Sequence, residues 1–268
     1  MVGDAGQMID DELARLEHAN NIAAGESVAR NVAGGLVRHA DGLAIVASGL
    51  PLRLFNQILV EDTRATPKAM AAAVALMRDR AAPFLVHLRD GTDDGFRAAM
   101  AELGLVDARP DEPTPGMALH PIPAELPDTP GLEIRPCVDR SGFDDHLRLA
   151  AAGFGMDETL IRSFLTDALL TDPAVRLYVG YAEGEPVSTG MGFLTGRVVG
   201  IYNISTIESA RRRGFGAAMT RRVAHDGAAA GCDVAILQSS AMGRPVYERL
   251  GYRTVVRYRA FVEGSDPS

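Results

Sequence analysis

A cluster of prolines constrains the fold of this 268-residue chain more than any other feature. Seven of the 15 prolines fall within residues 110–130. Proline fixes φ and has no N–H to donate, so such a stretch is excluded from helix interiors and from central strands. We therefore expect an extended, stiff connector here and a domain boundary near 125–130. The two parts, residues 1–125 and 126–268, are each long enough to bury a core.

The charge of the chain is unevenly distributed. Residues 1–130 hold 11 basic and 19 acidic residues (11 − 19 = −8), and residues 131–268 hold 16 of each, so the net charge of −8 lies entirely in the first part. A duplex-binding protein usually presents a basic face, so we expect no nucleic-acid partner. No apolar run approaches the ~18 residues of a membrane span. The acidic N-terminus does not resemble a secretory signal, which predicts a cytoplasmic protein. The two cysteines, Cys137 and Cys232, are too few for a four-cysteine zinc site, and we expect no metal.

Apolar periodicity predicts a regular order of elements in the second part. Strands are expected at 132–136, 175–182, 186–194, 198–207, 233–238 and 252–262, and helices at 143–152, 157–170, 215–229 and 245–250. This order predicts an α/β (α+β) fold with a mixed, mostly antiparallel sheet flanked by helices.

The first part contains a weak echo of the second. Helices are expected at 10–33, 66–80 and 96–103, and strands at 43–47, 54–61 and 84–88. In both parts a strand is followed by a short helix that ends in Leu-Gly and then by another strand: Leu103-Gly104 in the first part, Leu250-Gly251 in the second. The echo favours a duplicated fold.

The segment that carries the chemistry leads from a strand into the helix expected at 215–229. Its turn reads Arg211-Arg-Arg-Gly-Phe-Gly216. A helix start presents backbone N–H groups without internal partners, and the helix dipole adds positive potential, so it suits a phosphate. Gly214 and Gly216 let the backbone come close to an anion, and the arginines add charge. The alternative is a solvated arginine run. A dinucleotide fingerprint is disfavoured because Met219 stands where its third glycine would be.

Two motifs make residues 131–262 resemble the GNAT family of N-acetyltransferases. Arg211–Gly216 fits the family's cofactor-loop pattern Arg/Gln-x-x-Gly-x-Gly/Ala, and it follows the fourth strand as expected. Downstream, Val246-Tyr-Glu-Arg-Leu-Gly-Tyr252 fits the family's aliphatic-Tyr-x-x-Leu-Gly-Phe/Tyr motif. The resemblance implies a GNAT fold. It also suggests a tandem arrangement in which the first part is a degenerate GNAT-like domain.

The resemblance also implies a site for acetyl-CoA, the acetyl donor. Backbone amides of residues 212–217 would hold the pyrophosphate, and the strand end would pair with the pantetheine arm. Tyr247 would protonate the leaving thiolate. A common family asparagine is replaced by Ser240, and a common proline by Glu208. The expected cofactor-binding residues are Thr206, Ile207, Arg211, Arg212, Arg213, Gly214, Phe215, Gly216, Ala217, Ser239 and Ser240.

No general base can be chosen from the sequence. Asn203 lies near the expected site but cannot accept a proton. Glu158 is better explained as a charged helix surface, and we expect His146 and His225 to lie on helix surfaces. A chain of water molecules would suffice to take up the proton.

The first part lacks the residues for the same chemistry. The segment before its alanine-rich helix, Glu61-Asp-Thr-Arg-Ala-Thr-Pro-Lys68, has no glycine and begins with two acids, which would repel a pyrophosphate. Met100 stands where Tyr247 stands in the second part. We therefore interpret residues 1–125 as a degenerate GNAT-like domain, or as an unrelated α/β domain, that packs against the active part.

The sequence thus predicts an acetyl-CoA-dependent transferase that acetylates an amine, with a small molecule slightly favoured over a protein terminus as the acceptor. A monomer or homodimer is the expected state. The alternatives are a non-catalytic acyl-CoA-binding regulatory module and a transferase for longer acyl chains.

Overall fold

The computed structural model describes residues 3–264, which form two compact units that each draw on separate stretches of chain. The first unit takes the chain up to Asn20 and Met117–Val255, and the second takes Asn21–Gly116 and the chain from Val256. Three of the described elements therefore contribute to both units: helix α1 (Gly3–Arg30), strand β6 (Thr114–Leu119) and strand β12 (Arg253–Glu263). The prolines predict a single domain boundary near residue 125. In the structure, the N-terminal segment instead packs with the unit built mainly from the second part, and the C-terminal segment packs with the other unit. The interpretation of residues 1–125 as a degenerate domain stays a prediction.

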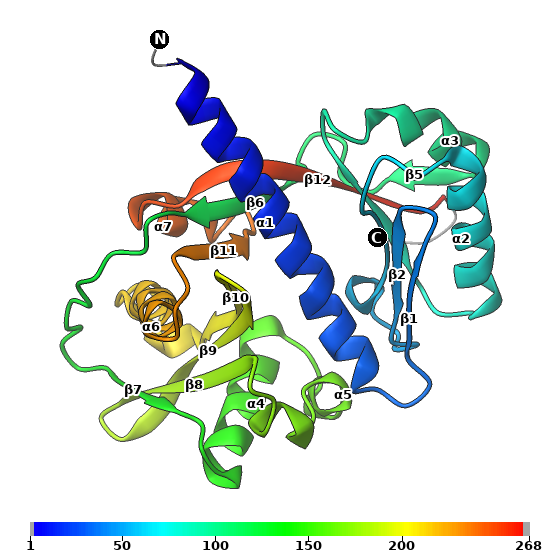
Figure 1. The fold of residues 1–268 in the computed structure, drawn as a ribbon. Helices are drawn as coiled ribbons and strands as arrows, with labels where there is room; N and C mark the ends of the chain where they lie inside the picture. Colours follow the sequence, from blue (N-terminus) through cyan, green and yellow to red (C-terminus); the bar gives the residue numbers. More distant parts are fainter. Residues whose placement is uncertain (1–2, 265–268) are drawn as a thin grey trace. The chain divides into compact units, whose positions relative to one another are not determined.

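The sheet of the first unit is an antiparallel meander extended by a parallel strand. β7 (Glu133–Pro136), β8 (Val175–Ala182), β9 (Glu185–Thr195) and β10 (Val198–Thr206) pair antiparallel in that order. Helix α6 (Phe215–Ala229) then leads to β11 (Val234–Gln238), which is parallel to β10 (Figure 1). A parallel neighbour requires such a crossover connection. This arrangement confirms the mixed, mostly antiparallel sheet predicted from the sequence.

Helices cover both faces of this sheet. On one face, Met219 and Val223 of α6 pack in a buried cluster with Val199 and Ile201 of β10. On the other face lie α4 (Arg140–Phe154), with Phe143 and Leu147 fully buried, and the first part of α1. The approach of α6 to β10 is close, since a Cβ on Gly227 would lie 2.5 Å from Val199 Cγ1.

The helix predicted over 157–170 is interrupted. Asp157 caps it as expected, because its carboxylate accepts a hydrogen bond of 2.7 Å from the Thr159 N–H. However, the helix α5 (Glu158–Phe164) ends early, and Leu165 leaves helical geometry with ψ 84°. A separate 3₁₀ turn, η3 (Asp167–Leu170), follows.

The proline-rich stretch is not a connector throughout, which corrects the expectation from composition. Strand β6 (Thr114–Leu119) lies beside β11 in the sheet, with Met117 and Ala118 fully buried. The reason is local: Pro115 sits near the strand's start, and residues 116–119 contain no proline, so they keep the N–H groups that a sheet needs.

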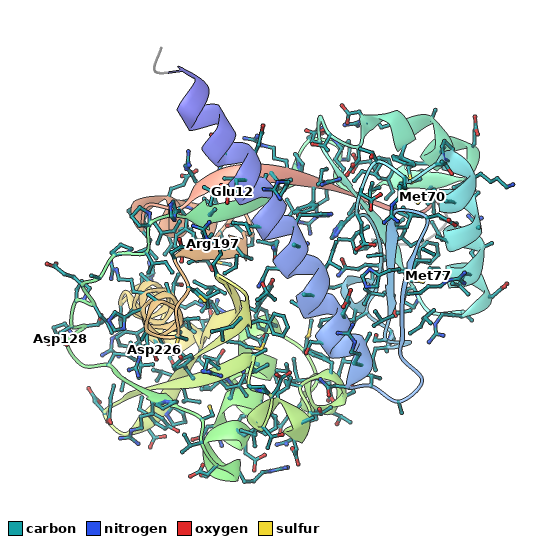
Figure 2. All side chains as sticks on the ribbon, in the orientation of Figure 1. Glu12, Met70, Met77, Asp128, Arg197 and Asp226 are labelled. Atoms are coloured by element: carbon teal, nitrogen blue, oxygen red, sulfur yellow. The ribbon has the colours of Figure 1, made fainter. Side chains whose placement is uncertain are left out.

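The second unit repeats the order of the first. β1 (Leu36–Ala40), β2 (Leu43–Ala47) and β3 (Asn56–Val60) pair antiparallel, and helix α2 (Pro67–Asp79) leads to β4 (Leu85–Arg89), parallel to β3. A short helix, α3 (Arg97–Glu102), and β5 (Leu105–Asp107) follow. Met70 and Met77 of α2, labelled in Figure 2, are buried in its core. The repeated strand–helix–strand crossover supports the predicted duplication. β1 was not predicted, and the strand expected over 54–61 starts at Asn56 because η1 (Arg53–Phe55) precedes it.

Among the described helices, none combines the length and the apolar character that a membrane crossing requires.

Candidate active site

The turn between β10 and α6 has the backbone geometry of an anion-binding loop. After the short turn η4 (Glu208–Ala210), Arg212 adopts φ 62° and Gly214 adopts φ 84°, both in the left-handed region. Left-handed residues among right-handed ones curl successive N–H groups toward a common point. A Cβ on Gly214 would meet no atom within 4 Å, so this backbone is open to a ligand.

The N–H groups of this turn are available for such a ligand. The N–H of Arg211 donates to Glu208 O at 3.2 Å, and the first bond into the helix runs from the Ala218 N–H to Gly214 O at 3.0 Å. The amides from Arg212 to Ala217 lie between these two bonds, at the positive end of the helix dipole. The donor set therefore fits a pyrophosphate, as the sequence pattern predicts.

The side chains around the turn have distinct roles. Arg211, Arg212 and Arg213 are exposed, and Arg211 Nε donates to Thr206 O at 3.1 Å. The Arg213 guanidinium lies 4.6 Å from the ring centroid of Phe215, whose side chain is buried. Phe215 thus anchors the start of α6 and can offer a ligand its backbone rather than its ring. Glu208, the acid that replaces the common proline, is exposed.

Strands β10 and β11 stop pairing before they end. Their last paired residues are Gly200 and Ile236, although β10 continues to Thr206. A β-bulge interrupts β10 between Tyr202 and Ser205, where two residues oppose one on β9. Within this bulge Asn203 adopts φ 55°. The end of β10, including Thr206, consequently has an edge that β11 does not cover, which is what a strand-like ligand requires.

The predicted residues after β11 lie around helix α7 (Arg244–Arg249). Tyr247 is half-buried, burial raises the pKa of its phenol, and its ring centroid lies 6.1 Å from that of Tyr252. Ser239 is buried and donates to Ser240 O at 2.9 Å, while the exposed Ser240 accepts from the Gly243 N–H at 3.2 Å. Both serine hydroxyls are thus already engaged within their own loop.

The position expected for His146 is wrong. Its side chain is fully buried beneath α4, and burial lowers its pKa to about 4. Leu147 and Phe143 on the same helix are equally buried, so His146 is a polar residue on an apolar helix face. The signal in the sequence was its spacing of three from Phe143 and four from Ala150, which places all three on one helix face.

Glu158 and His225, the other residues considered as general bases, lie at the surface. Glu158 pairs with Arg162 at 2.7 Å, a helix-surface ion pair. His225 is partly exposed on α6 and lies 3.4 Å from Asp226. Neither is placed for chemistry at the β10–β11 opening.

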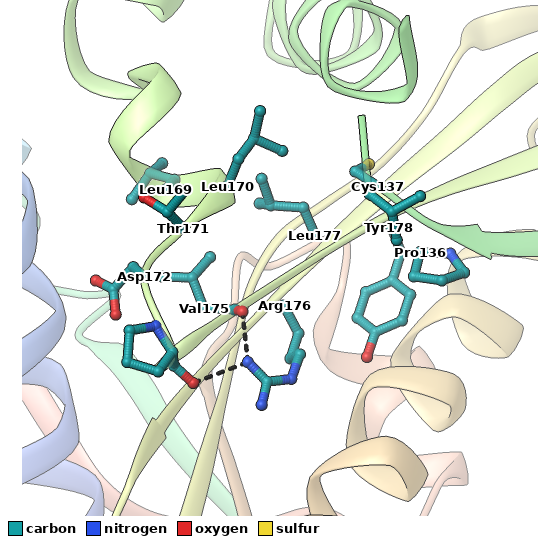
Figure 3. A pocket seen from close by; sticks show the side chains of 12 residues that line it. Pro136, Cys137, Leu169, Leu170, Thr171, Asp172, Val175, Arg176, Leu177 and Tyr178 are labelled. Carbon is teal, nitrogen blue, oxygen red and sulfur yellow. Dashed lines mark hydrogen bonds between the residues drawn. The ribbon is translucent and has the colours of Figure 1, made fainter. Parts of the chain in front are cut away.

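A cavity of about 380 Å³ lies elsewhere in the first unit (Figure 3). It is lined by the start of β8, the end of β7 and the residues of η3. Arg176 at its wall donates to the carbonyls of Pro173 and Val175, both at 2.8 Å. Val175 pairs with Phe193 of β9, whereas Thr206 pairs with Ser188. The cavity therefore lies at the opposite end of the strands from the arginine–glycine turn and contains none of the predicted site residues.

A family model for the GNAT acetyltransferases matches residues 144–252, which include the turn, the strand opening and Tyr247. Residues 144–252 form a GNAT-family domain. The family indicates acyl-CoA-dependent acetyl transfer, with acetyl-CoA as donor.

Solved structures show that the GNAT arrangement extends over more of the chain. A GCN5-related N-acetyltransferase from Kribbella flavida is 16% identical with a TM-score of 0.72, covering 93% of this chain and 96% of its own. One from Sphaerobacter thermophilus is 18% identical with a TM-score of 0.61 over 87% and 83%. A tandem GNAT protein from the clavulanic acid biosynthesis pathway is 14% identical with a TM-score of 0.57 over 84% and 79%. At these identities the likeness concerns the fold. No curated protein matches the chain.

Among residues 3–264, no three His, Cys, Asp or Glu side chains gather in a way that could hold a metal ion.

Proposed function

We propose that this protein transfers the acetyl group of acetyl-CoA to an amine, and that the acceptor is a small molecule. The observation that carries the proposal is the arginine–glycine turn at the start of α6. Arg212 and Gly214 are left-handed at the start of a helix, a backbone arrangement that forms anion-binding concavities. This turn directly follows β10, and β11 does not pair with the end of that strand.

The cofactor residues are assigned on the same basis. The amides of 212–217 hold the pyrophosphate, and Arg211 and Arg213 add positive charge beside it. Thr206 and Ile207 offer the strand edge to the pantetheine arm. Ser239 and Ser240 shape the facing loop, although their own hydrogen bonds leave them less free to bind a ligand.

Direct transfer requires an amine lone pair to attack the thioester carbonyl while the carbon–sulfur bond breaks. The leaving thiolate takes up a proton, and the Tyr247 hydroxyl is the proposed donor. Burial raises the pKa of that phenol, so the hydroxyl is protonated at neutral pH and can donate its hydrogen to the sulfur as the carbon–sulfur bond breaks.

The test is a thiol-release assay on the purified chain with acetyl-CoA and a panel of primary amines, combined with calorimetry of coenzyme A binding. Binding together with release of free thiol supports the transferase. Binding without thiol release on any amine would favour a non-catalytic acyl-CoA-binding module. If coenzyme A does not bind, both the transferase and the acyl-CoA-binding module are excluded. We also propose that the protein acts in the cytoplasm as a monomer or homodimer.

A further inference from the structure

A cluster of buried polar side chains lies on the α1 face of the sheet, where β10 and β11 separate. Tyr202 and Gln238 each stand two residues beyond the last paired residues, Gly200 and Ile236. Because side chains alternate along a strand, these positions share one face. Val198 and Ile236 pack there with Leu13 of α1. Tyr202 and Gln238 therefore mark the two sides of the opening on the face turned to α1.

Helix α1 contributes a carboxylate and an amide to this cluster. Glu17 is fully buried and its Oε1 accepts from Gln238 Nε2 at 2.5 Å. Asn20 is fully buried as well and donates to Phe193 O at 3.1 Å. Asn20 reaches the sheet because Gly200 has no side chain: a Cβ there would lie 2.0 Å from Asn20 Oδ1.

Hydrogen-bond chemistry fixes the direction of each group. The carbonyl of Phe193 can only accept, so the Asn20 amide nitrogen faces it and Asn20 Oδ1 must accept from the Tyr202 hydroxyl, at 2.8 Å. A carboxylate can only accept, so the Gln238 nitrogen faces Glu17 and Gln238 Oε1 points elsewhere as an acceptor. The cluster thus combines a formal negative charge with oriented acceptors.

We infer that Glu17 binds the acceptor as its ammonium ion and takes up the proton that the amine must lose before it attacks. This inference rests on the proposed function. The Gln238 amide supplies a neutral N–H donor to Glu17, and a primary ammonium supplies the same kind of donor with a full charge. An ammonium adds the attraction between two opposite charges, which the neutral Gln238 amide lacks, and a buried charge favours a charged partner. The acceptor therefore replaces the Gln238 amide at Glu17. Tyr202 and Gln238 are only half-buried, so the cluster is not sealed.

The proton balance is simple. One N–H bond of the ammonium breaks, an O–H bond forms on Glu17, and the electron pair left on nitrogen attacks the acetyl carbonyl. After the attack the nitrogen loses a second proton, which restores the Tyr247 hydroxyl that protonated the thiolate. The proton on Glu17 returns to solvent, so one proton is released in all. The assignment selects basic primary amines over amines that are neutral at pH 7.

The test compares Glu17→Gln with Glu12→Gln, which removes the same charge from the same helix at an exposed position. Glu12 is half-exposed and lies 3.3 Å from Arg197 (Figure 2). Calorimetry measures coenzyme A binding, and thiol release measures kcat and KM on a panel of alkylamines, polyamines and arylamines. We expect coenzyme A affinity to stay within twofold in both variants. We expect kcat/KM for the cationic amines to fall by about 100-fold in Glu17→Gln and less than twofold in Glu12→Gln.

Three results would overturn the inference while leaving coenzyme A binding, and hence the donor site, in place. They are wild-type rates in Glu17→Gln, an equal loss on arylamines that carry no charge, and turnover of no cationic amine by the wild-type protein. Loss of coenzyme A binding by the wild-type protein would instead refute the proposed function. If Glu17→Gln does not fold, as judged by circular dichroism, Tyr202→Phe serves in its place. It keeps the ring and removes one oxygen of the cluster, so a rise in amine KM of about tenfold is expected, and an unchanged KM contradicts the inference.

Discussion

The imidazole of His146 lies between the backbone of β8 and the bulge of β10. Its Nδ1 is 3.1 Å from the carbonyl oxygen of Tyr178, and its Nε2 is 3.4 Å from the side-chain nitrogen of Asn203. A carbonyl only accepts, so Nδ1 carries the hydrogen and Nε2 accepts from Asn203. The Asn203 carbonyl accepts from the Thr189 hydroxyl at 2.7 Å. A neutral histidine therefore holds the left-handed residue of the bulge from one side while β9 holds it from the other.

This burial predicts a pH-dependent stability. The pKa of His146 falls from 6.5 to about 4 in the folded protein, so the unfolded chain binds a proton that the folded chain does not bind between these values. Stability is then complete above pH 6.5 and falls as the pH drops toward 4. The expected loss from this residue at pH 5 is about 2 kcal/mol. Urea unfolding of wild type and His146→Gln at pH 7.5 and 5 measures it. His225→Gln, at a partly exposed position, is the control, and equal pH responses of all three proteins would contradict the prediction.

The proposed phosphate-binding role of the arginine–glycine turn is tested by Gly214→Glu. We expect the affinity for coenzyme A to fall at least about 100-fold, because the substitution places a negative charge at the proposed pyrophosphate position. Gly196→Glu is the matched control, since Gly196 also has a positive φ and no atom within 4 Å of an added Cβ, but it lies in the turn before β10. Both variants carry similar backbone strain of ~1–2 kcal/mol. Calorimetry checks the outcome, and an equal loss of affinity in the two variants would attribute the effect to strain alone.

The proposed proton donor is tested by Tyr247→Phe. We expect kcat to fall about 100-fold while coenzyme A affinity stays unchanged, because the substitution removes one hydroxyl and keeps the ring. Tyr252→Phe is the control: its hydroxyl is buried without a hydrogen-bond partner among the described residues, so its loss should leave both turnover and folding intact. Steady-state thiol release provides the measurement, and full activity in Tyr247→Phe would exclude this residue from proton transfer.

The close contact between α6 and β10 predicts that a glycine-to-alanine change there has the opposite effect on stability from the same change in α1. In a helix interior this substitution normally stabilises by ~0.5–1 kcal/mol. Gly25→Ala in α1 should do so, because its Cβ would be 3.7 Å from Val46 Cγ1, an ordinary contact. Gly227→Ala should instead destabilise by about 1–3 kcal/mol, because its Cβ would lie 2.5 Å from Val199 Cγ1. Denaturant midpoints decide, and a stabilised Gly227→Ala protein would show that the helix can move away.

Several elements could be predicted because local physics determines them. The helix over 215–229 was placed to the residue by its amphipathic period and by the glycines before it. β8 was placed equally well by its apolar run and its flanking turn residues. The predictions failed where context overrode composition. β6 was not predicted because prolines flank residues 116–119. Its pairing depends on these few proline-free residues and on a partner strand far along the chain.

The candidate site divides in the same way. The arginine–glycine turn could be interpreted from residues 211–216 alone, since its backbone freedom, its charge and the helix that follows are all local properties. Glu17 could not be recognised in an acidic N-terminal segment, because only the folded chain brings it to Gln238, 221 residues away. The burial of His146 likewise depends on which face of α4 meets the sheet. Backbone conformation follows largely from neighbouring residues, whereas the environment of a charge depends on every segment that excludes water from it.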